Sequence, residues 1–137
     1  GAPPDAAEID HPIPRSEDGP RVPAVTDIRT LHRAGRYAVV AAAPRTGRLH
    51  QIRRHLKHIS CPLIGDVRYG KGEHNRLFRE HHDLHRLALH ARSLRLVHPV
   101  TGAPLCITAP IPADLAGAMI ALGAPASVLA DVLDDMS

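Results

Sequence analysis

Aromatic residues are almost absent from this sequence, which has no tryptophan, two tyrosines and one phenylalanine among its 137 residues. A hydrophobic core must therefore be built from Leu, Ile, Val and Ala, and there are few rings on which single-stranded bases could stack. Long apolar runs are also missing, which argues against a membrane span. With 44% hydrophobic and 23% charged residues, the composition predicts one folded domain and not a disordered chain.

Cysteine is also scarce. Cys61 and Cys106 do not form a C-x-x-C pair, so a disulfide framework is not expected and a reducing compartment is favoured. The N-terminus has no charged start followed by an apolar stretch, so secretion is not predicted. We expect a cytoplasmic protein.

Acidic residues are missing from one stretch of the chain. Seventeen Lys and Arg against 14 Asp and Glu give a net charge of only +3, but residues 45 to 57 contain no carboxylate. A cationic stretch of this kind suits a polyanion such as nucleic acid, although a solvated helix face would explain it too. The cations in the stretch are Arg45, Arg48, Arg53, Arg54 and Lys57.

Residues 1–21 are rich in proline and show no periodicity, which predicts an extended arm or linker. Alternation over residues 22–31 and a β-favouring run over 37–43, joined by a segment with glycine, predict a hairpin. We expect residues 22–123 to form the main domain and 124–137 to form a short helix or tail.

A helix is predicted next. Leu49, Ile52, Leu56 and Ile59 recur at steps of three, four and three, as on one face of a helix. Thr46 or a neighbour is a candidate N-cap.

The second half of the chain predicts further short elements. Residues 65–85 are rich in Gly, His and charge and predict a long surface loop with short helical pieces. Alternation over 93–98 and 104–109 predicts another hairpin, and 113–122 predicts a helix. The fold class is therefore α+β, with a mainly antiparallel sheet.

One cation lies where the pattern predicts a core. Arg53 follows Leu49 by four residues and precedes Leu56 by three, so it shares their helix face. A guanidinium facing a core costs several kcal/mol unless a carboxylate meets it. None of the acids in residues 22–112 is an obvious partner, so the partner is expected outside this chain. Alternatively Arg53 extends along the stripe to water, and the pattern leaves both readings open.

Four motifs in order resemble one enzyme family. They match the RluA-type pseudouridine synthases, which isomerise uridine to pseudouridine within RNA, and the PAVT run at 23–26 is most similar to the tRNA pseudouridine synthase C branch. The resemblance covers roughly residues 8–123, the C-terminal part of the family's catalytic domain. The motifs are TGRLHQIRRHL (46–56), PLIGD (62–66), LHA (89–91) and HPVTG (98–102).

The resemblance implies specific roles. A family arginine at the position of Arg53 pairs with the catalytic aspartate, which belongs to an upstream His-Arg-Leu-Asp motif that this sequence lacks. The chain alone is therefore expected to be inactive, and the chemistry needs no cofactor or metal. His50 is expected to line the site. Phosphate contacts are expected from Arg45, Arg48, Arg54 and Lys57.

Two further questions stay open at this stage. The alternative function is a non-catalytic RNA-binding module that uses the basic helix at 48–58. The Gly65-Asp66 pair fits an RNA groove and a tight turn equally well.

Among RNA partners, tRNA is expected more than rRNA. The eleven histidines invite a metal site, but no Cys or carboxylate beside them completes a recognisable set of metal ligands, so no metal is predicted.

Overall fold

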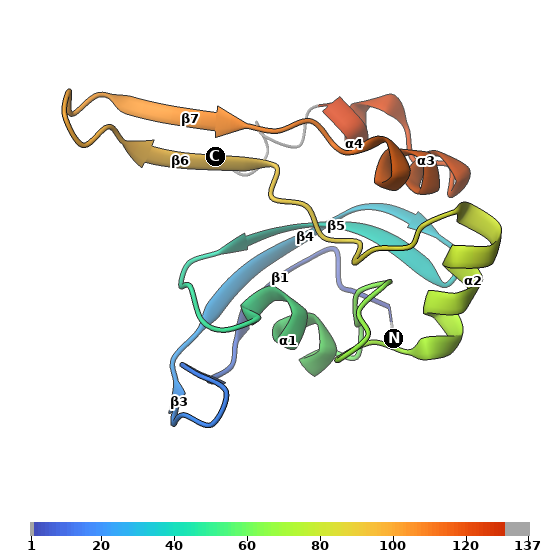
Figure 1. Cartoon of the computed structure of the whole chain (residues 1–137), viewed down its shortest axis with the longest axis horizontal. Helices are drawn as coiled ribbons and strands as arrows, with labels where there is room; N and C mark the ends of the chain where they lie inside the picture. Colours follow the sequence, from blue (N-terminus) through green and yellow to red (C-terminus); the bar gives the residue numbers. More distant parts are fainter. Residues whose placement is uncertain (1, 131–137) are drawn as a thin grey trace.

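A long antiparallel hairpin forms the middle of the fold. The computed structural model describes residues 2–130, and in it β4 (Val25–Ala34) pairs along its length with β5 (Tyr37–Pro44). Gly35 makes the connection at φ 58°, a left-handed conformation that glycine adopts readily because it has no Cβ. The first predicted hairpin is therefore confirmed, and Figure 1 shows it crossing the molecule.

The segment before the hairpin belongs to the same sheet. β1 (Ala6–Asp10) pairs antiparallel with β4, which gives the strand order β1-β4-β5. β2 (Ile13–Pro14) and β3 (Arg21–Val22) form a small second sheet. The prediction of an extended arm over residues 1–21 is wrong for these strands. Tertiary pairing with β4 and the burial of Ile9 fix a segment whose prolines hide any periodicity.

The predicted helix is present on one face of this sheet. α1 (Gln51–His58) directs Leu56 into a cluster with buried Ile9 and Ile28, against which Ile52 also packs. The helical stripe in the sequence therefore marks the core face of α1 correctly. The connection between β5 and α1 places the start of this helix close to the beginning of β4 (Figure 1).

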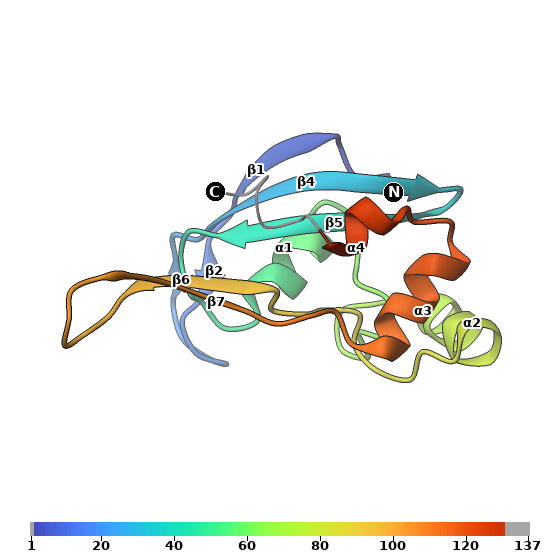
Figure 2. The same ribbon diagram turned by 90° about the horizontal axis from the view of Figure 1, so that it is seen from above.

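The C-terminal helices pack against the hairpin from its other side. α3 (Ala113–Ala121) confirms the predicted helix, and α4 (Ala126–Ala130) follows it. Met119 is buried in a cluster that includes Val39 of β5. Figure 2 shows α1 and α3 beside different parts of the sheet. The rest of the expected C-terminal segment, residues 131–137, lies outside the described residues.

Residues 65–85 are more regular than predicted. They contain α2 (Gly72–His82), an 11-residue helix, where only short helical pieces were expected. Phe78 is buried against Leu84 and Ala118, and this tertiary contact stabilises a segment whose local composition favours a loop. α2 is the longest helix described, and no helix in residues 2–130 is long and apolar enough to cross a membrane.

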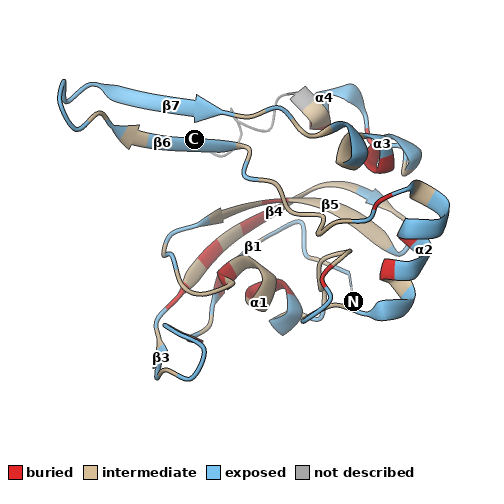
Figure 3. Cartoon of the chain, viewed as in Figure 1, coloured by how far each residue is buried: buried red, intermediate tan, exposed pale blue. Residues whose placement is uncertain are grey.

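A second hairpin extends from the body of the molecule. β6 (Ser93–Val97) and β7 (Pro104–Thr108) pair antiparallel, as the sequence predicts, and much of their surface is exposed (Figure 3). With this sheet the fold class is α+β with antiparallel sheets, as expected. The cross-strand apolar pairs are Leu94 with Ile107 and Leu96 with Leu105.

The role of β1 can be tested by truncating its buried side chain. Ile9→Ala should lower the free energy of unfolding by about 2–4 kcal/mol, because the side chain is 5% exposed and lies between Ile28 and Leu56. Ile120→Ala, at a position 59% exposed, is the matched control and should change it by less than about 1 kcal/mol. Urea unfolding measures both, and equal small effects would argue that residues 6–10 are an unstructured arm.

Candidate functional site

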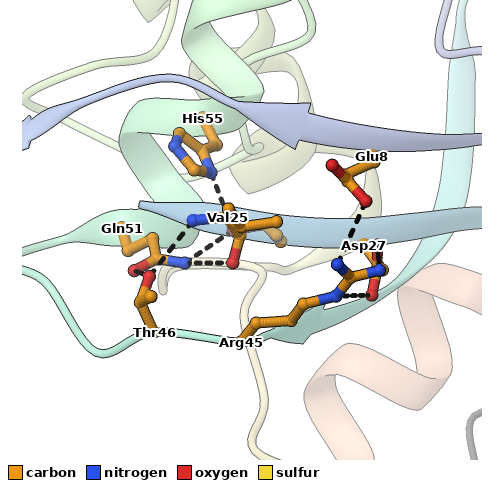
Figure 4. A network of polar contacts seen from close by, with 8 residues as sticks. Glu8, Val25, Asp27, Arg45, Thr46, Gln51 and His55 are labelled. Atoms are coloured by element: carbon orange, nitrogen blue, oxygen red, sulfur yellow. Dashed lines mark hydrogen bonds and ion pairs between the residues drawn. The ribbon is translucent and has the colours of Figure 1, made fainter. Parts of the chain in front are cut away.

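The N-terminal end of α1 is fixed by one buried glutamine. The Gln51 side-chain amide donates to the carbonyl of Val25 at 2.8 Å and to the hydroxyl of Thr26 at 2.9 Å. Its carbonyl oxygen accepts from the Thr46 hydroxyl at 2.6 Å (Figure 4). It also accepts from the Arg48 backbone N–H at 3.1 Å. The N-cap position is His50 and no side-chain hydrogen bond caps it, so the prediction that Thr46 or a neighbour caps the helix is wrong for Thr46. It holds Gln51, which ties the helix start to β4.

His55 continues this network into the core. The ring is fully buried, with its Nδ1 2.7 Å from the Thr26 hydroxyl and its Nε2 2.9 Å from the carbonyl of His11. A carbonyl can only accept, so Nε2 carries the proton and Nδ1 accepts from the hydroxyl. Both ring nitrogens are thus used in hydrogen bonds within the fold. His55 is a structural residue, and it fastens α1 to β4 and to the segment after β1.

The expected carboxylate partner of Arg53 is present in this chain. Arg53 donates from Nε and Nη2 to the two carboxylate oxygens of Asp66 at 2.9 and 2.8 Å, a parallel bidentate pair. The Asp66 side chain is 0% exposed and that of Arg53 is 21% exposed. The inference of a buried acidic partner is confirmed. The expectation that no acid of this chain fills that position is wrong, because the turn at residues 63–66 folds Asp66 back against α1.

The ion pair shifts the pKa of both Asp66 and Arg53 in the direction that favours their charged forms. Burial by itself would raise the pKa of the Asp66 carboxyl. The hydrogen bond from Arg53 and those from the backbone N–H groups of Tyr69 and Arg68 outweigh burial, so the pKa is lowered. The hydrogen bond to Asp66 likewise raises the pKa of Arg53. Both groups are therefore charged near neutral pH.

The loop that carries Asp66 has little freedom. Gly65 has a φ of 80°, and a Cβ there would lie 2.1 Å from the carbonyl oxygen of Arg86. At Gly70 a Cβ would lie 2.4 Å from the carbonyl oxygen of Asp66. Asn75 of α2 braces the same loop, since it accepts from the Gly65 N–H at 2.8 Å and donates to the Asp66 carbonyl at 3.1 Å. The carboxylate is thus positioned by glycine contacts and by a buried amide.

Tyr69 lies at the centre of the cationic groups. The guanidinium carbons of Arg53, Arg54 and Arg68 lie 5.1, 5.4 and 5.4 Å from its ring centroid. Its hydroxyl is 3.0 Å from Nδ1 of His50. Three positive charges around one aromatic ring are held partly by cation–π attraction. We call these five residues, with Asp66, the Tyr69 cluster.

His50 is uncharged within this cluster. Burial is the largest cause that lowers the pKa of its imidazole. The positive charges of Arg53, Arg68 and Arg54 lower this pKa further. Its backbone is left-handed, with a φ of 51°, and it occupies the position before α1. A neutral imidazole next to a phenol is able to donate or to accept one hydrogen bond.

The remaining predicted cations are not part of the cluster. Arg45 points to the sheet and forms ion pairs with Asp27 at 2.7 Å and Glu8 at 3.1 Å (Figure 4). Arg48 donates from Nε to the carbonyl of Pro23 at 2.9 Å. Lys57 is exposed and has no ion pair with any residue in the described range 2–130. The structure therefore gathers His50 with Arg53 and Arg54, and it leaves Arg45 neutralised elsewhere.

Sequence reasoning missed Tyr69 and undervalued Asp66. Tyr69 follows Arg68 directly, but its other two cationic partners come from α1, so the sequence around it does not mark it as the centre of a cluster. Asp66 had one usable signal, its place after Gly65 in the PLIGD motif, which sequence analysis could not separate from an ordinary turn.

The importance of the pair can be measured. Asp66→Asn should lower the free energy of unfolding by about 2–4 kcal/mol, because it leaves the Arg53 guanidinium without a charge partner. Asp27→Asn is the matched control. It breaks an ion pair whose side chains are 56% and 35% exposed, and it should cost less than about 1 kcal/mol.

The loss of stability in Asp66→Asn should depend on pH. Because the folded state lowers the pKa of Asp66, its stabilising effect is fully present above the ordinary carboxyl pKa of about 4. The effect is lost as pH falls through the lower pKa of the folded state. Urea unfolding at pH 7 and at pH 3 should therefore show a smaller difference between the wild type and Asp66→Asn at pH 3. A constant difference would contradict the assignment.

Comparison with known proteins gives a consistent result. No protein-family profile matches the chain. The tRNA pseudouridine synthase C of Vibrio cholerae is 53% identical over 74 residues, which are 54% of this chain and 30% of that protein. A protein of Chloroflexus aurantiacus described as an uncharacterized RNA pseudouridine synthase is 42% identical over 123 residues, 84% of this chain and 37% of that protein.

Solved structures agree with the sequence matches. Human RNA Pseudouridylate Synthase Domain Containing 4 superimposes with a TM-score of 0.66 at 27% identity, covering 88% of this chain and 57% of that one. Human RNA Pseudouridylate Synthase Domain Containing 1 gives a TM-score of 0.61 at 25% identity, covering 84% and 53%. The chain thus spans about a third of the length of the two bacterial relatives and a little over half of each human chain. In sequence and in fold, it is homologous to one part of the RNA pseudouridine synthases.

Proposed function

We propose that this chain is part of an RNA pseudouridine synthase that acts on tRNA more than on rRNA, in the cytoplasm. The observation that carries the proposal is the match to a pseudouridine synthase over 84% of the chain at 42% identity. The alternative of a non-catalytic RNA-binding module is not favoured, because the relatives described above are named as synthases.

The reaction breaks one bond and forms another on the same sugar carbon. The glycosidic bond between N1 of uracil and C1′ of ribose breaks, the detached uracil rotates, and C5 bonds to C1′. The hydrogen on C5 leaves as a proton and N1 gains one, so the net change is an isomerisation. The target uridine must leave its stack to reach such a site.

Arg53 has N–H donors left to bind a second carboxylate in addition to that of Asp66. Its Nε and one Nη2 hydrogen are directed at Asp66, and guanidinium groups carry five N–H donors. The side chain is 21% exposed, so the remaining donors are not all enclosed. In this proposal Arg53 orients and keeps ionised the catalytic aspartate that the resemblance places outside this sequence. Asp66 acts as a positioning residue that fixes the guanidinium plane.

RNA phosphates would meet the cations beside this pair. Arg54, Arg48 and Lys57 are the proposed contacts, with His50 lining the site. Arg54 lies beside the pair, with its guanidinium carbon 5.4 Å from the centroid of the Tyr69 ring. Arg45 is a weaker candidate, since Asp27 and Glu8 already balance its charge.

The phosphate contacts predict a salt effect. Lys57→Ala should weaken tRNA binding and reduce the slope of log Kd against log salt by about 1, because it removes one phosphate contact. Arg45→Ala is the matched control and should leave the slope nearly unchanged. Fluorescence anisotropy at several salt concentrations measures both. Equal slopes for Lys57→Ala and the wild type would argue against the phosphate role.

Catalysis is tested by tritium release from tRNA that carries 5-tritiated uridine. A longer protein that joins this chain to the Asp-bearing motif should release tritium, and the chain alone should not. Arg53→Ala in the longer protein should reduce release to background, while its Kd for tRNA changes by less than about tenfold. Release by Arg53→Ala at the wild-type rate would contradict the role of Arg53. A longer protein that binds tRNA and rRNA but releases no tritium from either would overturn the proposed function.

A further inference from the structure

Two histidine rings stack at the C-terminal end of α1. The ring centroids of His58 and His11 lie 3.7 Å apart, and the two ring planes differ by 14°. His11 follows β1 directly, so the stack joins the helix to the N-terminal strands. His55 approaches the His11 ring edge-on, with 6.5 Å between centroids, and both of its nitrogens are used in the fold. By contrast, no group in residues 2–130 hydrogen-bonds the ring nitrogens of His11 or His58.

The groups around this stack are positive. Burial lowers the pKa of the His11 imidazole more than any other cause does. The charges of His58 and His55 from α1 and of Arg21 from β3 lower this pKa further. Arg21 is held nearby, since its Nη1 donates to the carbonyl of Pro12 at 3.0 Å. No carboxylate of the described residues contributes to this pKa shift, so the cluster lacks a counter-charge there.

The chemistry of the cluster suits an anion more than a metal ion. Within residues 2–130, no three His, Cys, Asp or Glu side chains are placed to hold a metal. Imidazole and guanidinium groups donate hydrogen bonds, and they bind phosphate oxygens most strongly when they are charged. His58 and Arg21 are exposed, so a phosphate on a large polyanion is able to reach them.

We propose that His11, His58 and Arg21 form a binding site for a phosphate group of the RNA backbone. This inference rests on the proposed function. It adds a contact at the opposite end of α1 from His50 and the Tyr69 cluster. The helix rises by about 12 Å over its length, so one stretch of RNA is able to contact both ends.

Binding at this site is coupled to proton uptake. Two protonated rings stacked 3.7 Å apart repel each other, and Arg21 adds to the repulsion at His11. A phosphate between these groups offsets the repulsion and raises the pKa of the His11 imidazole. The free protein holds this pKa low and the complex raises it, so the complex binds more protons than the free protein. RNA binding should therefore tighten as pH falls toward the ordinary histidine pKa of about 6.5 and below it.

Fluorescence anisotropy with tRNA at constant ionic strength tests the site. Between about pH 7.5 and about pH 5.5 the wild-type Kd should fall by about fivefold more than the Kd of His58→Gln, which cannot take up the proton. His81→Gln is the matched control and should behave as the wild type, because His81 is an exposed histidine on α2. Equal pH dependence in the wild type and His58→Gln would overturn the inference. So would an equal loss in both variants, because it would indicate a general charge effect.

NMR titration of the histidine rings separates the site from its occupant. The titration midpoint of His11 in chloride should rise when tRNA is added, and it should also rise with inorganic phosphate at millimolar concentration. A midpoint that moves with neither, or with inorganic phosphate and not with tRNA, would overturn the inference. In the longer protein with the Asp-bearing motif, a midpoint raised by tRNA without any tritium release would support the phosphate site and count against the proposed function.

Discussion

The bidentate pair of Arg53 and Asp66 is the interaction on which the candidate site depends. A guanidinium four-fifths buried on a helix face is tolerable only beside a carboxylate, and the carboxylate is itself enclosed. Two backbone N–H groups and the side chain of Arg53 share its oxygens. The cost of burying two charges is thus offset by four hydrogen bonds to the carboxylate. The result is a cation of fixed orientation on a helix that is itself anchored to β4.

That anchoring comes from neutral groups. Gln51 and His55 are buried polar residues one helical turn apart, and both contact Thr26 on β4. Because each donor in this small network meets an acceptor, burial is not penalised, and the helix has one preferred position. The charged groups and the neutral groups therefore have different structural roles. Neutral hydrogen bonds locate α1 on the sheet, and the ion pair sets the direction of the cation that it presents.

Sequence patterns predicted most of the fold because the elements are amphipathic. Both hairpins, α1 and α3 follow from alternation or from helical spacing of apolar residues. β1 and α2 could not be predicted in this way, because Ile9 and Phe78 are buried by partners far away in the chain. The site was predicted in part. The position of Arg53 in the apolar stripe required an acidic partner. The Gly65-Asp66 pair, however, looks the same in sequence whether it only forms a tight turn or also supplies that carboxylate. Only the folded chain brings Asp66 to α1.

The brace formed by Asn75 links the site to distant packing. Asn75 stands on α2, and one turn further along the helix Phe78 packs against Ala118 of α3. Any shift of α2 on α3 is therefore passed to the loop that carries the Arg53 partner, through two hydrogen bonds to its backbone. The hydrophobic interface between these two helices consequently helps to fix the orientation of the Arg53 guanidinium.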